Sequence, residues 1–147
     1  MTVNAVQQVR TRAVAILRRN GHRDEILVTG GHNASRNEDY FRPLAAEVAA
    51  GEHAGDTLRR VIRSKTGSDI SGLKLLGSLE VTHHGIAGSV NEVTFIYAAI
   101  LVDGALHTLD ELLLSTGAIA SWQPLEAFRD DDAELLPDGL LEVIDRA

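Results

Sequence analysis

The side chains of Val61, Ser64 and Lys65 decide what chemistry one helix face of this chain can support. They stand three and four positions apart, so they share a face of the helix predicted over residues 55–66. A Mg²⁺ ion needs hard oxygen ligands, usually carboxylates together with phosphate oxygens of a substrate. Valine offers no donor, serine offers one weak neutral oxygen, and lysine brings a charge that repels a cation. We therefore expect no divalent metal on this face, whereas Lys65 could contact a phosphate directly.

Residues around this face keep the spacing of a known catalytic motif. Glu52 precedes the predicted helix, Arg60 lies within it, and Gly67 follows it at a position suited to a helix C-cap. This spacing resembles the Nudix box, G-x5-E-x7-R-E-U-x-E-E-x-G-U, of enzymes that hydrolyse nucleoside diphosphates linked to another group. The resemblance implies that Glu52 and Arg60 form an ion pair between the loop and the helix. The expected scaffold positions are Gly51, Glu52, Arg60 and Gly67.

The residues that bind metal in the Nudix box are replaced in this chain. By the resemblance, the three glutamates that hold the metal ions fall at Val61, Ser64 and Lys65. We therefore expect a degenerate box without the usual metal-dependent pyrophosphohydrolase activity, and no cofactor. A divergent hydrolase would be the alternative, with Glu52 and Glu92 as its catalytic residues and Mg²⁺ or Mn²⁺ as its metal.

Segments outside the box extend the resemblance over nearly the whole chain. Residues 39–47 read DYFRPLAAE, similar to the aromatic-Arg-Pro-Leu-Gly segment that precedes the box in one Nudix subgroup. Residues 76–101, 119–128 and 135–144 are similar to the strand-loop-strand, Trp-x-Pro-Leu and Pro-Asp-Gly-Leu segments that follow it. The resemblance implies an α/β (α+β) fold, the Nudix fold, with a mixed β-sheet sandwiched between helices. It also implies a single Nudix domain over residues 1–147.

The resemblance also assigns residues to a substrate or ligand cleft. The expected cleft residues are Arg42, Glu47, Lys65, Glu80 and Glu92. Together with Glu52, the carboxylates of Glu80 and Glu92 could form a reduced metal site. The interpretation that we favour is that Glu80 and Glu92 pair with arginines across the sheet.

Two further motifs have the composition of ligand sites but lack the geometry. Residues 30–37 read GGHNASRN, without the glycine spacing of a dinucleotide-binding or P-loop motif. We interpret residues 30–39 as a hairpin loop. His83 and His84 are adjacent, and neighbours on a strand point to opposite faces, so we expect exposed histidines and no metal site there.

Hydrophobic periodicity and turn residues predict alternating strands and helices. Asn20-Gly21 is a strong hairpin signal, and residues 84–89 are expected to form a second connecting loop. Strands are predicted over residues 11–18, 25–29, 40–44, 46–48, 74–83, 91–102 and 118–123, and helices over residues 55–66 and 137–146.

Composition narrows the classes of function. The 147 residues suit one domain, and the chain has no cysteine, so disulfides and thiolate metal sites are excluded. No apolar run approaches the ~20 residues of a membrane span, and we expect a cytoplasmic protein. A net charge of -7 argues against nucleic-acid binding. Arginines are concentrated in the first third of the chain and acidic residues in the last third, which we interpret as solvated surface.

Two kinds of function fit these observations. The first is a noncatalytic module that binds a nucleotide-like small molecule or a protein partner. The second is a hydrolase that cleaves a nucleoside diphosphate-linked substrate with substitute acidic residues. Lys65 favours the first, because an ammonium group in a metal site opposes catalysis but can bind phosphate. The resemblance also allows a homodimer.

Overall fold

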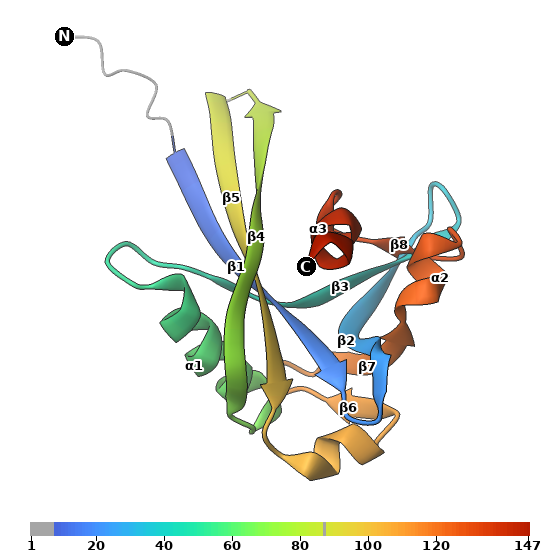
Figure 1. The fold of residues 1–147 in the computed structure, drawn as a ribbon. Coiled ribbons are helices and arrows are strands. Elements are labelled where there is room, and N and C mark those ends of the chain that lie inside the picture. The colour runs from blue at the N-terminus through green and yellow to red at the C-terminus, as the bar shows by residue number, and fades with distance from the viewer. Residues whose placement is uncertain (1–7, 87) are drawn as a thin grey trace, which may run out of the picture.

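The computed structural model describes residues 8–86 and 88–147 as a mixed β-sheet with helices on both of its sides (Figure 1). The strands are β1 (Gln8–Arg19), β2 (His22–Asn33), β3 (Glu38–Glu47), β4 (Ile70–Gly85), β5 (Gly88–Leu101), β6 (Glu111–Leu113), β7 (Ile119–Pro124) and β8 (Glu134–Leu135). The helices are α1 (Ala54–Thr66), α2 (Leu125–Arg129) and α3 (Leu140–Arg146), with a 3-10 helix η1 (Gly104–Thr108). The mixed sheet confirms the predicted fold class. Among the described residues, no helix is long and apolar enough to cross a membrane.

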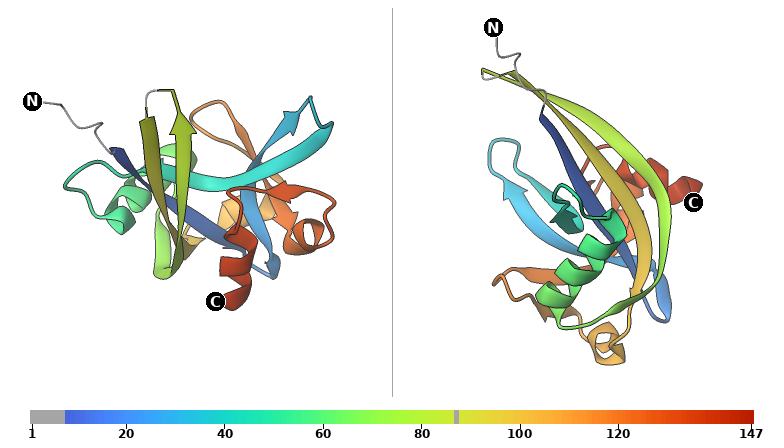
Figure 2. Two further views of the ribbon diagram at one scale, coloured as in Figure 1. Left: turned by 90° about the horizontal axis from the view of Figure 1, so that it is seen from above. Right: turned by 90° about the vertical axis from the view of Figure 1, so that its left-hand side faces the viewer.

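Strand β1 is the centre of the sheet. The strand order is β4-β5-β1-β3-β2-β7-β6, with β8 added beside β3 and a further pairing between β1 and β2. Strand β1 runs parallel to β5 and antiparallel to β3. Its first half therefore lies between β5 and β3, while its second half also reaches β2. This branching bends the sheet into the curved shape seen from two further directions in Figure 2.

Alternation along β1 divides the core into two layers. Ala13, Ala15 and Leu17 face the layer beneath α1, which also contains Leu58 and Ile62 of that helix. The opposite layer contains the intervening β1 residues and the apolar side chains of the C-terminal helices. Its members are Val14, Ile16, Ile26, Val28, Ile96, Leu125, Phe128, Leu135, Leu140 and Ile144. The period-2 pattern of a buried strand thus places alternate β1 residues beneath different helices.

Helix α1 forms where the sequence predicts it. Leu58 and Ile62 are fully buried and form the apolar stripe that packs this helix on the sheet. Gly67 ends the helix with φ of 79°, and its amide donates to the carbonyl oxygen of Arg63 at 2.8 Å. A left-handed residue with this bond is a common helix ending that glycine adopts without a Cβ penalty. The helix and its C-cap are confirmed.

The predicted loop over residues 30–39 is wrong. Strand β2 continues to Asn33 and β3 begins at Glu38, so only a short turn separates them. Gly30 lies opposite Phe41 and Gly31 opposite Tyr40, and a Cβ on either glycine would press against the opposing aromatic ring. These glycines therefore leave space for two aromatic rings of the neighbouring strand. The predicted loop did not take this requirement into account.

Other differences concern element ends and short elements. Strands β4 and β5 are longer than predicted, and they leave only residues 86 and 87 between them in place of the loop over residues 84–89. Helix α3 begins at Leu140, three residues later than predicted. The prediction missed β6, β8, α2 and η1, which are too short to show a period.

A buried histidine holds η1 in place through contacts with distant parts of the chain. The Nδ1 atom of His107 accepts from the Asn20 amide at 2.9 Å, so its Nε2 donates to the Leu101 carbonyl oxygen at 2.9 Å. The Trp122 ring stacks on the imidazole. These contacts come from distant parts of the chain, so no local pattern reports them.

Candidate functional site

An arginine-lined cavity of about 370 Å³ lies where β1, β3 and β5 meet the segment before α3. We call it the basic cavity. Its lining residues are Arg10, Arg12, Val14, Arg42, Pro43, Ala45, His83, Glu92, Thr94, Leu136 and Pro137. Volumes of roughly 300–1,000 Å³ are usual for sites that bind small molecules. The cavity therefore has the size of a small-molecule site.

Strand alternation brings the charged side chains of the basic cavity together. Arg10 and Arg12 are two positions apart on β1, so they share one face of the sheet. In the parallel register with β5, Arg10 lies opposite Glu92 and Arg12 opposite Thr94. His83 of β4 reaches the same place from the far side of β5. Three adjacent strands thus direct polar groups into one cavity.

Positive charge dominates the basic cavity. Glu92 is the acidic residue among its lining residues, and its side chain is only 13% exposed. Its two carboxylate oxygens lie 3.9 Å from Arg12 Nη1 and 3.7 Å from His83 Nε2. The Nε atom of Arg12 is buried without a hydrogen-bond partner among the described residues. A buried donor without a partner is costly, and an anion could satisfy it.

Arg10 and Arg42 complete the cationic lining in different ways. Arg10 forms an ion pair with Glu47, whose hydrogen bond and charge raise the pKa of Arg10 and lower the pKa of Glu47. The guanidinium of Arg42 lies 5.4 Å from the centre of the Tyr40 ring, a cation–π contact. Within the described residues, Arg42 has no acidic partner, so its charge remains available to a ligand.

Lys65 lies against the wall of the basic cavity from the side of α1. Its Nζ donates to the carbonyl oxygen of Ala45 at 3.0 Å, and Ala45 lines the cavity. Burial, and secondly the charge of Arg12, lower the pKa of Lys65 from its ordinary value. The ammonium group is therefore a fixed cation in a partly desolvated place.

The α1 face with Lys65 does not fit a divalent metal ion. Val61 offers no ligand atom, Ser64 is exposed and neutral, and Lys65 already places its charge on the nearby carbonyl. Within residues 8–86 and 88–147, no three His, Asp or Glu side chains come together as metal ligands would. The residues present thus supply neither the charge nor the oxygen atoms that Mg²⁺ requires.

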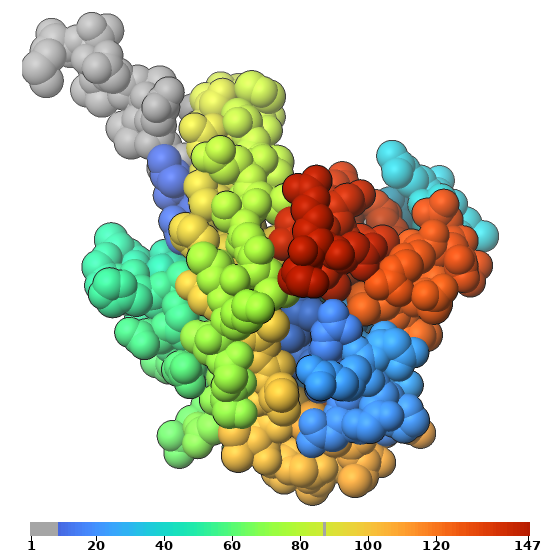
Figure 3. Space-filling view, viewed as in Figure 1, coloured from blue at the N-terminus to red at the C-terminus, as the bar shows by residue number. Residues whose placement is uncertain are grey.

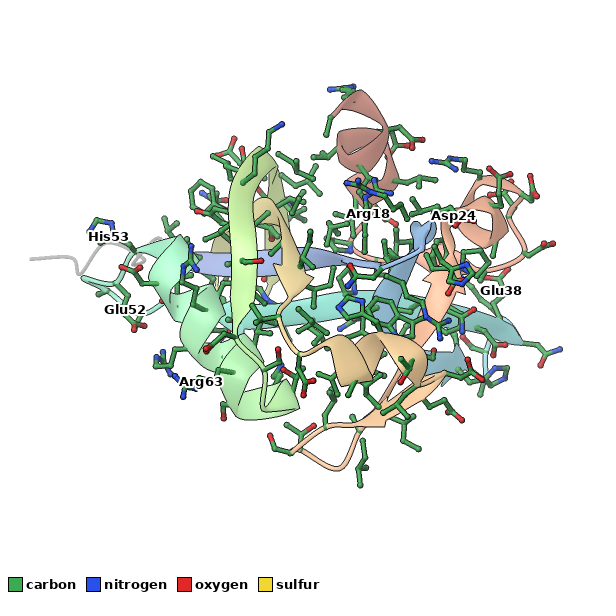
Figure 4. All side chains as sticks on the ribbon, turned by 60° about the horizontal axis from the view of Figure 1, so that its bottom comes forward. Arg18, Asp24, Glu38, Glu52, His53 and Arg63 are labelled. Carbon is green, nitrogen blue, oxygen red and sulfur yellow. The ribbon has the colours of Figure 1, made fainter. Side chains whose placement is uncertain are left out.

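Glu52 belongs to the scaffold of the loop before α1. Its carboxylate accepts from the Ala49 amide at 3.1 Å and from Arg60 at 3.2 Å. The hydrogen bond from the Ala49 amide is the main reason that the pKa of Glu52 is below its ordinary value. The hydrogen bond and the charge of Arg60 lower this pKa further. Figure 4 shows Glu52 beside His53 at the start of α1. The ion pair implied by the resemblance is present in the structure.

The structure separates the acidic residues that a reduced metal site would need. Glu92 lines the basic cavity, Glu52 is held by its own loop, and Glu80 is exposed on β4. The favoured interpretation, pairing across the sheet, holds for Glu92 with Arg12. It does not hold for Glu80, which forms no ion pair within the described residues.

Of the five predicted cleft residues, Arg42 and Glu92 line the basic cavity. Glu47 lies beside it through its pair with Arg10, and Lys65 lies behind the Ala45 wall. His83 is exposed, as expected from the sequence, but it also lines the cavity, and Arg10 and Arg12, interpreted above as solvated surface, line it too. The spacing of residues 10, 12 and 14 was the available signal, because it places two arginines and a valine on one strand face.

A second hollow, of about 720 Å³, has the opposite charge. We call it the acidic hollow. Its acidic lining residues are Glu38, Asp39, Asp131, Asp132, Glu134, Asp138 and Glu142. His32 and Arg36 also line it, and His32 Nδ1 lies 2.8 Å from Asp39. This charge disfavours a phosphate-bearing ligand.

Solved structures with a similar fold include a Nudix hydrolase. A NUDIX hydrolase from Nitrosomonas europaea superposes with a TM-score of 0.65 at 16% identity, over 94% of this chain and 87% of that chain. The Escherichia coli ORF135 protein gives 0.59 at 16% identity, over 95% and 91%. A MutT structure, from work on the Aliivibrio salmonicida and Vibrio cholerae proteins, gives 0.54 at 12% identity, over 95% and 100%.

These similarities establish that the chain has the Nudix fold. No protein-family model matches the sequence, and no curated protein matches it either. At 12–16% identity the likeness concerns the fold and leaves activity to be argued from the site.

Proposed function

We propose that this Nudix-fold chain is a noncatalytic module that binds a phosphate-bearing, nucleotide-like small molecule in the basic cavity without a divalent metal. The observation that carries the proposal is the hydrogen bond from Lys65 Nζ to the Ala45 carbonyl oxygen. It places a fixed positive charge on the helix face where the Nudix box would have a metal-binding carboxylate. A cation that is part of the chain takes the place of a mobile one.

Electrostatic repulsion prevents Lys65 and a divalent metal ion from occupying this place together. Two unit charges of the same sign 4 Å apart repel by about 4 kcal/mol at an effective dielectric constant of 20. Because Lys65 is partly buried and is held at the Ala45 carbonyl, its charge is not free to move away. With Arg12 nearby, a Mg²⁺ ion would meet several positive charges and no carboxylate on the α1 face of Val61, Ser64 and Lys65.

The arginines supply the groups that recognise phosphate. A guanidinium group offers a planar set of donors that matches two phosphate oxygens, and such charged hydrogen bonds are stronger than neutral ones. Arg12 has an unpaired buried donor, and Arg42 has no acidic partner among the described residues. Val14, Pro43 and Pro137 form an apolar part of the cavity wall, and a less polar surrounding strengthens such contacts.

The divergent hydrolase remains the competing function because Glu92 lines the same cavity. A general base would need the Glu92 carboxylate near an attacking water. Here the two oxygens of that carboxylate are directed toward Arg12 and His83. These partners favour a structural role for Glu92, since Arg12 offsets its charge and His83 contacts its second oxygen inside the cavity.

The experiment is a binding and hydrolysis screen on the full chain. Pyrophosphate, nucleoside diphosphates, sugar nucleotides and dinucleotides are tested by thermal shift with and without magnesium, and product release is followed in parallel. A ligand at ~100 times its Kd should add about 2.7 kcal/mol of stability, equally with and without magnesium. Stabilisation without hydrolysis supports the proposal. Metal-dependent product release would favour the hydrolase, and no stabilisation by any phosphate compound would refute the binding module.

The two lysines of the chain provide a matched pair of variants. Lys65→Met removes the fixed cation behind the cavity wall, and Lys74→Met removes the charge of an exposed lysine on β4. We expect pyrophosphate to bind several-fold more weakly to the first variant and normally to the second. Equal affinities of both variants and the parent would show that Lys65 has no part in binding.

A further inference from the structure

The outer edge of β4 is a long, regular strand edge at the end of the sheet. Irregularities in its pairing with β5 occur between Ser71 and Lys74 and between Leu75 and Gly77. Residues 77–85 then pair with β5 without interruption. In the described part of the chain, no strand pairs with the other side of this segment. The tip of the β4–β5 hairpin projects beyond the body in the ribbon and space-filling views (Figures 1 and 3), whereas α3 packs against β4 at Gly77 and Leu79.

This edge lacks most of the features that prevent edge-to-edge pairing. Natural edge strands are usually short or carry prolines, lysines or bulges. Residues 77–85 contain no proline and no lysine, and both bulges lie before them. Val81 is 37% exposed on this segment, and Ile86 just beyond it is fully exposed. The segment is thus suited to accept another strand.

We propose that residues 78–86 of β4 pair antiparallel with the same residues of a second copy of this chain, across a two-fold axis through Thr82. In this register Glu80 lies opposite His84 of the second copy, and the symmetry makes the contact twice. The Nδ1 atom of His84 lies 3.2 Å from Ser89 Oγ, which leaves Nε2 free for the carboxylate. A cross-strand pair of this kind stabilises a sheet, whereas like charges oppose it.

Charge complementarity selects this register over its neighbours. An axis through Glu80 would place the two Glu80 carboxylates opposite each other. An axis through Val81 would place Glu80 opposite Thr82, without a charged or imidazole partner. Only the axis through Thr82 gives Glu80 an imidazole on the facing strand among these three choices. One basic and one acidic residue, four positions apart, thus define a self-complementary edge.

The pairing also reaches the basic cavity. In the proposed register, His83 lies opposite Val81 of the second copy. Residues directly opposite on antiparallel strands share a face and have Cβ atoms about 4.5–5.5 Å apart. Since His83 lines the cavity, the second copy's Val81 extends the cavity wall beyond His83. The pairing itself does not depend on the proposed ligand, so the two proposals fail separately.

Cysteine cross-linking tests the register directly, because the chain has no cysteine of its own. In the variant Thr82→Cys, two copies would bring their Cα atoms to about 4.5–5.5 Å, within the range of a disulfide. Ser78→Cys is the matched control, since Ser78 is exposed on the same strand face. Its sulfur atoms would be about 27 Å apart in the proposed register. Covalent dimers of the first variant alone support the proposal; dimers of neither, or of both equally, overturn it.

Charge reversal provides a second, independent test by sedimentation equilibrium. Glu80→Lys and His84→Glu should each raise the Kd of the dimer about tenfold or more, since the first removes the carboxylate that faces His84 and the second places two carboxylates opposite each other. Mixing the two variants should restore a dimer. In the mixed dimer the introduced lysine faces the introduced glutamate, and the native His84 of one copy faces the native Glu80 of the other.

The control for charge reversal is Glu111→Lys, at the opposite edge of the sheet. This variant should pair normally, because its charge lies far from the proposed interface. A monomeric parent, or a mixture of the two β4 variants that stays monomeric, contradicts the proposal.

Discussion

The basic cavity and the acidic hollow are neighbours that share one segment of chain. Leu136 and Pro137 line the first, whereas Asp138 and Gly139 line the second. Strand β3 also serves both, with Arg42 in the basic cavity and Asp39 in the acidic hollow. A short stretch of backbone therefore separates two spaces of opposite charge.

The difference shows that an uneven distribution of charge along the sequence produces two sites of opposite charge in the fold. Arginines of the first third of the chain line the basic cavity, and acidic residues of the last third line much of the acidic hollow. From the sequence alone, both groups are interpreted as solvated surface. In the fold they give an anion one favourable place and one unfavourable place. The larger volume of the acidic hollow does not make it the better phosphate site.

The largest expected effect comes from making the α1 side of the basic cavity acidic. The combined variant Val61→Glu, Ser64→Glu and Lys65→Glu should bind Mg²⁺, because it restores carboxylate oxygens on the helix face. Without metal its stability should fall, since like charges then share one face. Magnesium at ~100 times its Kd should return about 2.7 kcal/mol.

The measurement for this variant is the melting temperature over a series of magnesium concentrations, with the parent as control. The parent should be indifferent to magnesium. Adding Ala45→Gly and Ala46→Gly to the three glutamates tests whether weak nucleotide pyrophosphohydrolase activity follows. A triple variant whose melting temperature ignores magnesium would show that the helix face lacks the geometry of a metal site.

Arg12→Ala should have the next largest effect, on the affinity for pyrophosphate. Hydrogen bonds to charged groups contribute about 1.5–3 kcal/mol, so we expect at least a tenfold rise in Kd. Asp132→Ala, in the acidic hollow, is the matched truncation and should leave the affinity unchanged or slightly improved. Isothermal titration calorimetry at two salt concentrations measures both. An equal loss of pyrophosphate affinity in the two variants would show that the basic cavity is not the preferred phosphate site.

A smaller gain is expected when Arg10 is released from its internal partner. Glu47→Gln keeps the size of the side chain and removes the charge that pairs with Arg10. An anion then no longer competes with a carboxylate for this guanidinium, and we expect about two- to threefold tighter pyrophosphate binding, the scale of an exposed ion pair. Glu38→Gln in the acidic hollow is the control. If Glu47→Gln weakened binding, Glu47 would be holding Arg10 in its binding position.

The smallest effect concerns the ion pair between α2 and α3. Asp145 accepts from Arg129 at 2.7 Å, and this bond lowers the pKa of Asp145 below its ordinary 3.8. A lowered folded-state pKa means that the pair stabilises the fold above about pH 4 and loses this effect as the pH falls through the folded value. Asp145→Asn should therefore melt slightly below the parent at pH 7 and level with it near pH 2. A difference that persists at pH 2 would assign the effect to packing.

Local sequence patterns were sufficient to predict much of the fold. Leu58 and Ile62 at helical spacing and Gly67 after them identified α1 and its end. The resemblance of the box identified the Glu52–Arg60 pair, which joins residues only eight positions apart. The Gly30 and Gly31 segment was misread, because the reason for these glycines is an aromatic ring on the next strand.

The sequence by itself determined the helix, the central strands and the loss of carboxylates from the α1 face, because each depends on neighbours within a few residues. Tertiary structure alone decided that Arg12, His83 and Glu92 meet, since β1 pairs with β5 across about 80 positions. It also decided that Lys65 reaches the Ala45 carbonyl, twenty residues away. Periodicity reports which face a side chain occupies, whereas strand pairing decides what lies opposite that face.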